Sequence, residues 1–322
     1  MFTFEKPRII VSKCIEFEHC RWNGMIIASD VVKLMKPHVE FLPVCPEVEI
    51  GLGVPREPVR VVAGEDGAPR LYQPATDTDW TAEMEGFAHR FLDGLPEVEG
   101  FLLKSRSPSC GIKEVKVYPN TPQGMPRKTG SGLFALAVAE RFPDTPQEDE
   151  GRLTNFRLRE TYLTQVFTLR EWRDVAAVGT MGALVRFHTR HKLLLMAYNE
   201  VAMRELGRIV ANHAGRPEEE VYAAYRAGLS GALARPAGHG PAINVLQHAL
   251  GYFDELTSAE KHFFLQSLED FRAGRVPLSV PTSIVRSWIV RFGQEYLAGQ
   301  SFFQPYPEEL VQISDSGKGR DL

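Results

Sequence analysis

The first part of the chain alternates short apolar runs with longer amphipathic segments. Apolar runs of four to six residues predict buried or half-buried strands at 7–11, 39–44, 100–103 and 115–118. Apolar residues at helical spacing predict helices at 30–38, 80–95 and 130–142. Strands that alternate with helices favour an α/β fold, with a mostly parallel, Rossmann-like sheet covered by helices.

The pattern changes after residue 151. Residues 141–151, RFPDTPQEDEG, are acidic, contain two prolines and lack apolar periodicity, so we interpret them as a linker. Helical spacing follows almost to the end, and Gly274 is expected to end one helix. The 322 residues therefore predict two domains, an α/β domain at 1–148 and an all-α domain at 149–322.

Composition excludes several classes of protein. Apolar residues make up 43% and charged residues 24% of the chain, as in globular proteins. No apolar run approaches the ~20 residues of a membrane helix, and the N-terminus, with Glu5 and no small-residue cleavage site, does not resemble a signal peptide. Four cysteines are too few for a disulfide scaffold, so we expect a cytoplasmic protein.

Positive charge is concentrated in one segment. Residues 152–192 carry eight Lys and Arg against three acidic residues, although the whole chain has a net charge of −4. A solvated helix face explains such a cluster, and so does a footprint for a phosphate backbone. The pI near 6.2 argues against a nonspecific nucleic-acid coat but not against a local patch.

Three cysteines follow predicted strands. Cys14 comes after 7–11, and Cys45 and Cys110 come after the next two strands that are expected to lie in the sheet. Ligands of parallel sheets bind outside the carboxyl ends of the strands, so the three thiols are expected to meet at one edge. Each lies in a turn and not inside an apolar run, where a core cysteine usually lies.

The residues alone leave three interpretations of these thiols open. They are structural or unrelated, or they bind zinc, or they hold a 4Fe-4S cluster whose fourth iron is an open Lewis acid. Zinc sites usually use paired CxxC ligands, which are absent, and Cys20 lies six residues from Cys14, which is not a typical zinc spacing. Nucleotide-binding GxGxxG and P-loop patterns are also absent.

Three segments carry a resemblance to a known family. VSKCIEFEHCRWNG (11–24), PVCPEVEIGLGVPREP (43–58) and KSRSPSCG (104–111) resemble, in order, the motifs of the thiouracil desulfidase (TudS) family, over about residues 7–145. In this chain Trp22-Asn23 stands where Tyr-Asp is common, and Glu16-Phe17 replaces a more usual Leu-Gly stretch. These departures leave the cysteines untouched but affect the shape of the pocket.

The rest of the chain resembles an all-helical domain of unknown function. The resemblance depends on FHTRHKLLLMAYN (187–199), NVLQHALGYF (244–253), PLSVP (277–281) and QSFFQPYPEEL (300–310). The fusion of the two parts resembles the RudS type of two-domain tRNA 4-thiouridine desulfidase. That resemblance implies a tRNA partner and the conversion of 4-thiouridine to uridine and sulfide without net redox change.

The family resemblance also implies a cofactor and its ligands. A 4Fe-4S cluster is expected on Cys14, Cys45 and Cys110, with one open iron that takes the thiocarbonyl sulfur, and Cys20 is not expected to be a ligand. Glu47 is the candidate general acid/base, unless it caps a turn or pairs with Arg56. Ser107 is the candidate hydrogen-bond partner of the substrate ring or of water, unless it only forms a Ser-Pro turn. Further residues expected around the substrate are Ser12, Arg21, Lys104, Arg106 and Ser109.

We expect the basic segment, residues 152–192, to bind the RNA. Arg186 and Arg190 share one helix face, as do His188 and Lys192. The predicted RNA-binding residues are Arg186, His188, Arg190, His191 and Lys192. Phe263, Phe264, Phe302 and Phe303 are expected in the core or at a domain interface. A desulfidase for free thiouracil or thionucleosides, and a metal- or redox-sensing protein without turnover, remain alternatives.

Overall fold

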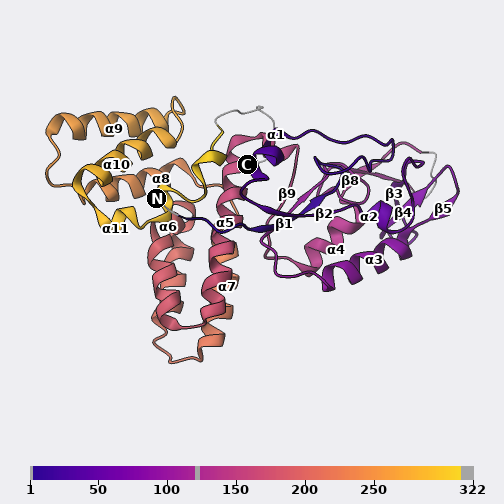
Figure 1. The fold of residues 1–322 in the computed structure, drawn as a ribbon, viewed down its shortest axis with the longest axis horizontal. Coiled ribbons are helices and arrows are strands. Elements are labelled where there is room, and N and C mark those ends of the chain that lie inside the picture. The colour runs from indigo at the N-terminus through magenta and orange to yellow at the C-terminus, as the bar shows by residue number, and fades with distance from the viewer. Residues whose placement is uncertain (1–2, 120–123, 313–322) are drawn as a thin grey trace. The chain divides into compact units, whose positions relative to one another are not determined.

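The computed structural model describes residues 3–119 and 124–312 and divides them into two compact units (Figure 1). The α/β unit comprises 5–162 with 309–312, and the helical unit comprises 3–4 with 163–308. The architecture confirms the predicted fold class, a mostly parallel sheet with helices followed by an all-α region. No helix among the described residues is both long and apolar enough to cross a membrane.

A four-stranded parallel sheet forms the centre of the α/β unit. Its strand order is β2 (Glu40–Val44), β1 (Arg8–Ser12), β6 (Gly100–Leu103) and β9 (Gln147–Asp149). Three of these strands lie at the predicted apolar runs. The residues of β6 are all buried, as expected for a strand covered on both faces.

Strand β9 corrects the interpretation of residues 141–151 as a linker. Gln147–Asp149 pairs in parallel with Phe101, Leu102 and Leu103 of β6, and the Phe101 amide donates to the Pro146 carbonyl at 2.9 Å. A three-residue edge strand needs only main-chain hydrogen bonds, which its polar sequence QED does not preclude. The acidic segment therefore completes the sheet.

A second, mixed sheet was not expected from the sequence. The order is β5-β4-β3-β7-β8, and only β3 and β7 run parallel. The predicted strand at 115–118, β7, belongs to this sheet and not to the first one. The members are β3 (Arg60–Ala63), β4 (Pro69–Gln73), β5 (Thr78–Asp79), β7 (Val115–Tyr118) and β8 (Lys128–Gly130).

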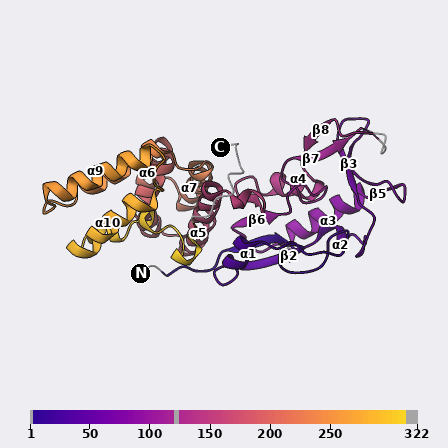
Figure 2. The same cartoon turned by 90° about the horizontal axis from the view of Figure 1, so that it is seen from above.

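Four helices complete the α/β unit. They are α1 (Asp30–Met35), α2 (Pro46–Glu49), α3 (Thr81–Asp93) and α4 (Leu133–Arg141). Helices α3 and α4 lie side by side (Figures 1 and 2), and the rings of Phe87 and Phe134 stack between them at 6.2 Å. Gly132 is the N-cap of α4 but Gly130 ends β8, so the helix predicted at 130–142 begins only at Leu133.

The helical unit has two apolar cores joined by α6. One is built around Trp172, Phe187 and Tyr225, and the other around Phe264 and Trp288. Helix α6 bridges them and is interrupted at Asn199 by non-helical backbone (φ −157°, ψ 96°). The helices are α5 (Phe156–Val178), α6 (Met181–Ala211), α7 (Glu218–Leu233), α8 (His239–Leu250), α9 (Ser258–Arg272), α10 (Ser279–Phe292) and α11 (Glu295–Ala298).

Two local expectations in this unit can be compared with the structure. Gly274 follows α9 in the left-handed region at φ 69°, and the Arg275 amide donates to the Asp270 carbonyl at 2.8 Å, which confirms the helix end. Among the four phenylalanines expected inside, Phe264, Phe302 and Phe303 are buried in the core. Phe263 is 66% exposed and lies outside it.

Candidate active site

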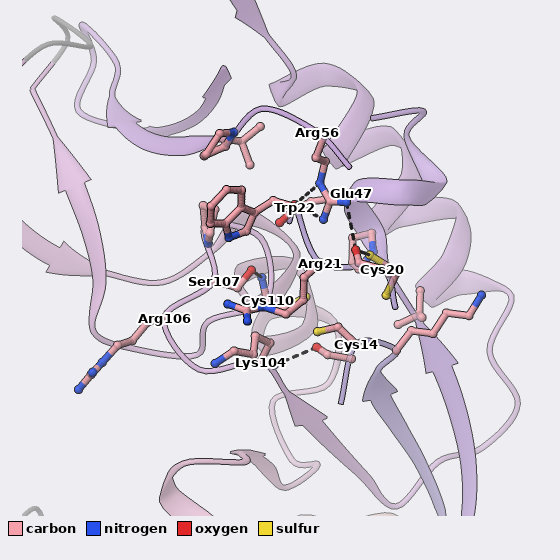
Figure 3. A pocket seen from close by; sticks show the side chains of 18 of the residues that line it. Cys14, Cys20, Arg21, Trp22, Glu47, Arg56, Lys104, Arg106, Ser107 and Cys110 are labelled. Carbon is pink, nitrogen blue, oxygen red and sulfur yellow. Dashed lines mark hydrogen bonds and ion pairs between the residues drawn. The ribbon is translucent and has the colours of Figure 1, made fainter. Parts of the chain in front are cut away.

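The strand order brings the cysteines together. Cys14 lies two residues beyond β1, Cys45 directly follows β2, and Cys110 lies in the loop after β6. Because these three strands are adjacent and parallel, their carboxyl ends share one edge of the sheet. The three cysteines and Cys20 all line one cavity of about 400 Å³ (Figure 3). All four are buried and unoxidised.

The thiols interact with each other and with nearby hydroxyls. The Cys45 thiol donates to the Cys20 carbonyl at 3.7 Å, and the neighbouring Cys14 thiol is the main cause that raises the pKa of Cys20 to about 11. The contact with Cys20, together with burial, raises the pKa of Cys45. Burial raises the pKa of Cys110, although hydrogen bonds from Ser12 and Ser107 oppose this. Any metal that binds here must therefore displace protons from sulfur.

The chemistry of the donors suits an iron–sulfur cluster. Within the described part of the chain, no group of three His, Cys, Asp or Glu side chains is arranged to hold a single metal ion. In a cluster each cysteine binds a different iron. Cysteine thiols gathered in one cavity are donors that suit such a cluster.

Glu47 is held by an arginine and a serine. In α2 it is 9% exposed, and its Oε2 accepts from Arg56 Nε at 2.8 Å and Nη2 at 2.6 Å. Its Oε1 accepts from Ser109 Oγ at 2.9 Å. Arg56 also donates to the carbonyls of Cys20 and Gly53, at 3.0 and 2.9 Å, so one guanidinium connects α2, the segment of Cys20 and its own loop. Glu47 thus forms the ion pair with Arg56 that the sequence offered as another role, and it also lines the cavity, so its acid/base role stays a prediction.

The loop that carries Cys110 is bound to the start of α4. The amides of Gly132, Leu133 and Ala135 donate to the carbonyls of Gly111, Pro108 and Ser109, at 2.8, 3.2 and 3.1 Å. A Cβ atom at Gly132 would lie 2.5 Å from the Ser109 backbone, so only glycine permits this approach.

Ser107 supports the same turn from inside. Its Oγ accepts from the amides of Ser109 and Cys110 at 3.2 and 3.1 Å, which is the turn-forming role considered in the sequence. The hydroxyl hydrogen stays available to donate, either to the Cys110 sulfur or into the cavity that Ser107 lines. The turn-forming role of Ser107 is therefore what the structure shows, and its role toward substrate or water stays a prediction.

The residues expected around the substrate divide into two groups. Ser12, Arg21, Lys104 and Arg106 line the cavity, whereas Ser109 lies behind Glu47, fully buried. Lys104 Nζ binds Glu150 and Ser105.

Arg106 lies at the exposed rim and pairs with Glu114 at 2.9 Å. Both cations of the loop are therefore neutralised by carboxylates in this structure. Their first role here is to hold the loop in place.

Sequence reasoning missed two residues of the site. Trp22 lines the cavity, and its signal was the aromatic position of the family turn. Glu150 anchors Lys104 and the Ser105 amide, but it belongs to the segment interpreted as a linker. No local sequence pattern points to Glu150, and its role is apparent only from its contacts in the folded chain.

The predicted RNA-binding residues do not share one surface. His191 is buried, with Nδ1 2.8 Å from Ser301 Oγ and Nε2 3.2 Å from Glu171 without hydrogen-bond geometry. His188 Nδ1 lies 3.1 Å from the Tyr225 hydroxyl, and burial is the main cause that lowers the pKa of His188 to about 4.

The three basic residues of the same set differ in exposure. Arg190 pairs with Glu171, whereas Arg186 and Lys192 are exposed. Three of the five predicted residues therefore bond within the helical unit, which leaves two of them facing solvent.

Comparisons with known proteins give a family match for each part of the chain. The model of the 2-thiouracil desulfurase family matches residues 9–150, and that of a protein family of unknown function, DUF1722, matches residues 192–307. The uncharacterized protein YbbK of Bacillus subtilis is 32% identical over 139 residues, which span 41% of this chain and 89% of YbbK. The uncharacterized protein YbgA of Escherichia coli is 29% identical over 164 residues, 50% of this chain and 96% of YbgA.

A solved structure also resembles part of the chain. It is titled as the 4Fe-4S-dependent thiouracil desulfidase TudS and is 29% identical, with a TM-score of 0.36, over 46% of this chain and 93% of that one. The family match itself covers β1 to β9 and includes all four cysteines of the cavity. Through residues 9–150, the chain therefore belongs to the 2-thiouracil desulfurase family.

Proposed function

We propose that this protein removes sulfur from 4-thiouridine in tRNA and that a 4Fe-4S cluster on Cys14, Cys45 and Cys110 is its cofactor. The observation that carries the proposal is the cavity lined by these three cysteines together with Glu47. The cluster, with three cysteine ligands, supplies a Lewis-acidic iron for the thiocarbonyl sulfur. Water replaces sulfur at C4, so the products are uridine and sulfide and no oxidant or reductant is consumed.

Glu47 is the proton carrier of the proposed reaction. The incoming water must lose a proton as it adds to C4, and the departing sulfur must gain one. Glu47 lines the cavity, and its carboxylate is fixed from both sides by Arg56 and Ser109. A carboxylate held in this way can accept the proton without first reorienting.

Ser107 and the walls of the cavity contribute positioning. The Ser107 oxygen is engaged by two backbone amides, so its hydroxyl has one hydrogen to donate to the water or to the substrate ring. Pro58, Val59 and Pro108 make part of the wall apolar, which limits the entry of bulk water.

The first test is anaerobic reconstitution with iron and sulfide, followed by measurement of 4-thiouridine absorbance in bulk tRNA. Cys110→Ala is expected to lose the cluster spectrum and the turnover together. Cys20→Ala is the matched control: it removes a thiol from the same cavity and is expected to retain cluster and turnover. A colourless protein with one zinc per chain would refute the proposal, as would a cluster-loaded protein that releases no sulfide.

A free thionucleoside is the second candidate substrate, and one observation favours it. Three of the five residues assigned to RNA are bonded within the helical unit, so the basic footprint is smaller than the sequence suggests. Turnover of tRNA and of free 4-thiouridine should be compared at rising salt. Action on tRNA is expected to weaken steeply with salt, whereas action on the nucleoside should stay nearly constant.

A further inference from the structure

We propose that Trp22 is the stacking platform for the substrate ring and that it selects aromatic thiones over aliphatic ones. The inference rests on the proposed function and extends it to a residue without an assigned role. Trp22 is 46% exposed and lines the same cavity as Cys14, Cys45 and Cys110 (Figure 3). About half of the indole surface is accessible and the side chain forms part of the cavity wall, so a molecule bound in the cavity can cover it.

The backbone around Trp22 is fixed, so the ring is presented from a rigid turn. The Trp22 carbonyl accepts from the Arg56 amide at 2.8 Å, and the Gly24 amide donates to the Arg21 carbonyl at 2.9 Å. Asn23 Oδ1 accepts from the Met25 amide at 3.2 Å, and Gly24 takes the left-handed conformation at φ 69°. Arg56 holds Trp22 through its backbone amide and Glu47 through its guanidinium, so platform and proton carrier are tied to one residue.

The surroundings of the indole fit a heteroaromatic base. The cavity pairs an apolar wall of Pro58, Val59 and Pro108 with the polar groups of Glu47 and Ser107. A planar base presents a π-face to indole and polar edges to hydrogen-bond partners, so it uses both kinds of wall. An aliphatic thioamide has the C=S group but no π-face, and it gains nothing from the platform.

The test compares Trp22→Ala and Trp22→Phe in the cluster-loaded protein with two substrates, 4-thiouridine and thioacetamide. Loss of one base–aromatic stack is expected to raise KM for 4-thiouridine about tenfold in Trp22→Ala, with kcat changed much less. Trp22→Phe is expected to restore most of the loss. Turnover of thioacetamide and the iron content per chain should not change.

Met25→Ala is the matched control. Met25 is 56% exposed in the same turn, but it does not line the cavity. A second readout needs no cluster: equilibrium dialysis of 4-thiouridine with the cluster-free protein should show a dissociation constant about tenfold higher for Trp22→Ala than for Met25→Ala.

Two results would overturn the platform. One is an equal rise in KM for both substrates, and the other is unchanged dialysis with Trp22→Ala. A wild-type protein that carries the cluster but desulfurates neither substrate would instead refute the proposed function. In that case the dialysis alone decides whether Trp22 binds the base.

Discussion

At the scale of single residues, the environment of Glu47 decides what its carboxylate can do. Both oxygens already accept hydrogen bonds, one from Arg56 and one from Ser109. Only 5% of the Arg56 side chain is exposed. Its charge therefore depends on Glu47 for compensation. Removing one partner of a buried pair leaves the other charge uncompensated.

Glu47→Gln is therefore expected to lose activity and stability at once. The amide keeps an acceptor for Ser109 but cannot carry a proton, so turnover should fall by about 10²- to 10⁴-fold. Loss of the ion pair should lower the free energy of unfolding by about 3 kcal/mol. Sulfide release and urea unfolding measure the two effects separately.

Glu49→Gln is the control for this variant, because Glu49 lies in the same helix and is exposed. It should change neither quantity measurably. Glu47→Gln protein that folds, holds iron and turns over at the wild-type rate would remove Glu47 from the mechanism.

At the scale of elements, the site depends on two contacts between segments that are distant in sequence. The start of α4 holds the carbonyls of the Cys110 loop, and the end of β9 holds Lys104 through Glu150. Both ends of the segment 104–111 are thus fixed from outside. These outside contacts add to the bonds of Ser107 with the amides of Ser109 and Cys110, which support the turn around Cys110 from inside.

Gly132→Ala tests the first contact. The new Cβ would lie 2.5 Å from the Ser109 backbone, so the loop must move away from α4. Overpacking of this kind costs about 1–3 kcal/mol of stability, and Cys110 moves with the loop. We expect a lower midpoint of thermal unfolding and less iron bound per chain after reconstitution.

Gly86→Ala is the control within the same unit. A Cβ there meets only the flexible end of Arg90, at 3.3 Å, inside helix α3. Its unfolding midpoint should stay the same or rise slightly, since alanine favours helix over glycine. Equal iron content in the two variants would show that the contact with α4 does not position Cys110.

At the scale of the whole molecule, the helical unit contains partly buried titratable groups that bear on stability. His188 is partly buried against Tyr225, and after burial the charges of Lys192 and His191 are the causes that lower its pKa from 6.5 to about 4. The folded protein therefore resists protonation at this ring. Between these two pH values the unfolded chain binds more protons, so stability rises with pH.

Lowering the pH from 7 to 5 is thus expected to destabilise the wild-type protein through His188. The effect should be about 1 kcal/mol once the partial exposure of the ring is considered. His188→Gln should show a smaller loss between the two pH values, measured by urea unfolding followed by circular dichroism. His213→Gln, at an exposed position, should behave like the wild type, and equal pH dependence in all three proteins would refute the assignment.

Sequence and structure agree where an element is marked by a local pattern, and they differ where an element depends on pairing with a distant segment. The apolar run 100–103 carries its own signal, because a strand buried on both faces must be apolar wherever it is placed. The alternation at 115–118 likewise marks a half-buried strand. Strand β9 has no such signal, since an edge strand is defined by main-chain pairing with β6. Strands β5 and β8 of the second sheet lack such a signal too, because they are short and contain no large apolar residue.

The sequence by itself determined the α/β and all-α classes, the positions of three cysteines after strands, and the motifs of the family. These depend on periodicity and on residues that are close together along the chain. Only the tertiary structure decided the partners: Ser109 for Glu47 across 62 residues, Glu150 for Lys104 across 46, and Ser301 for His191 across 110. The physical reason is that a hydrogen bond or ion pair requires two groups within about 3 Å, and only the folded chain brings such distant residues that close.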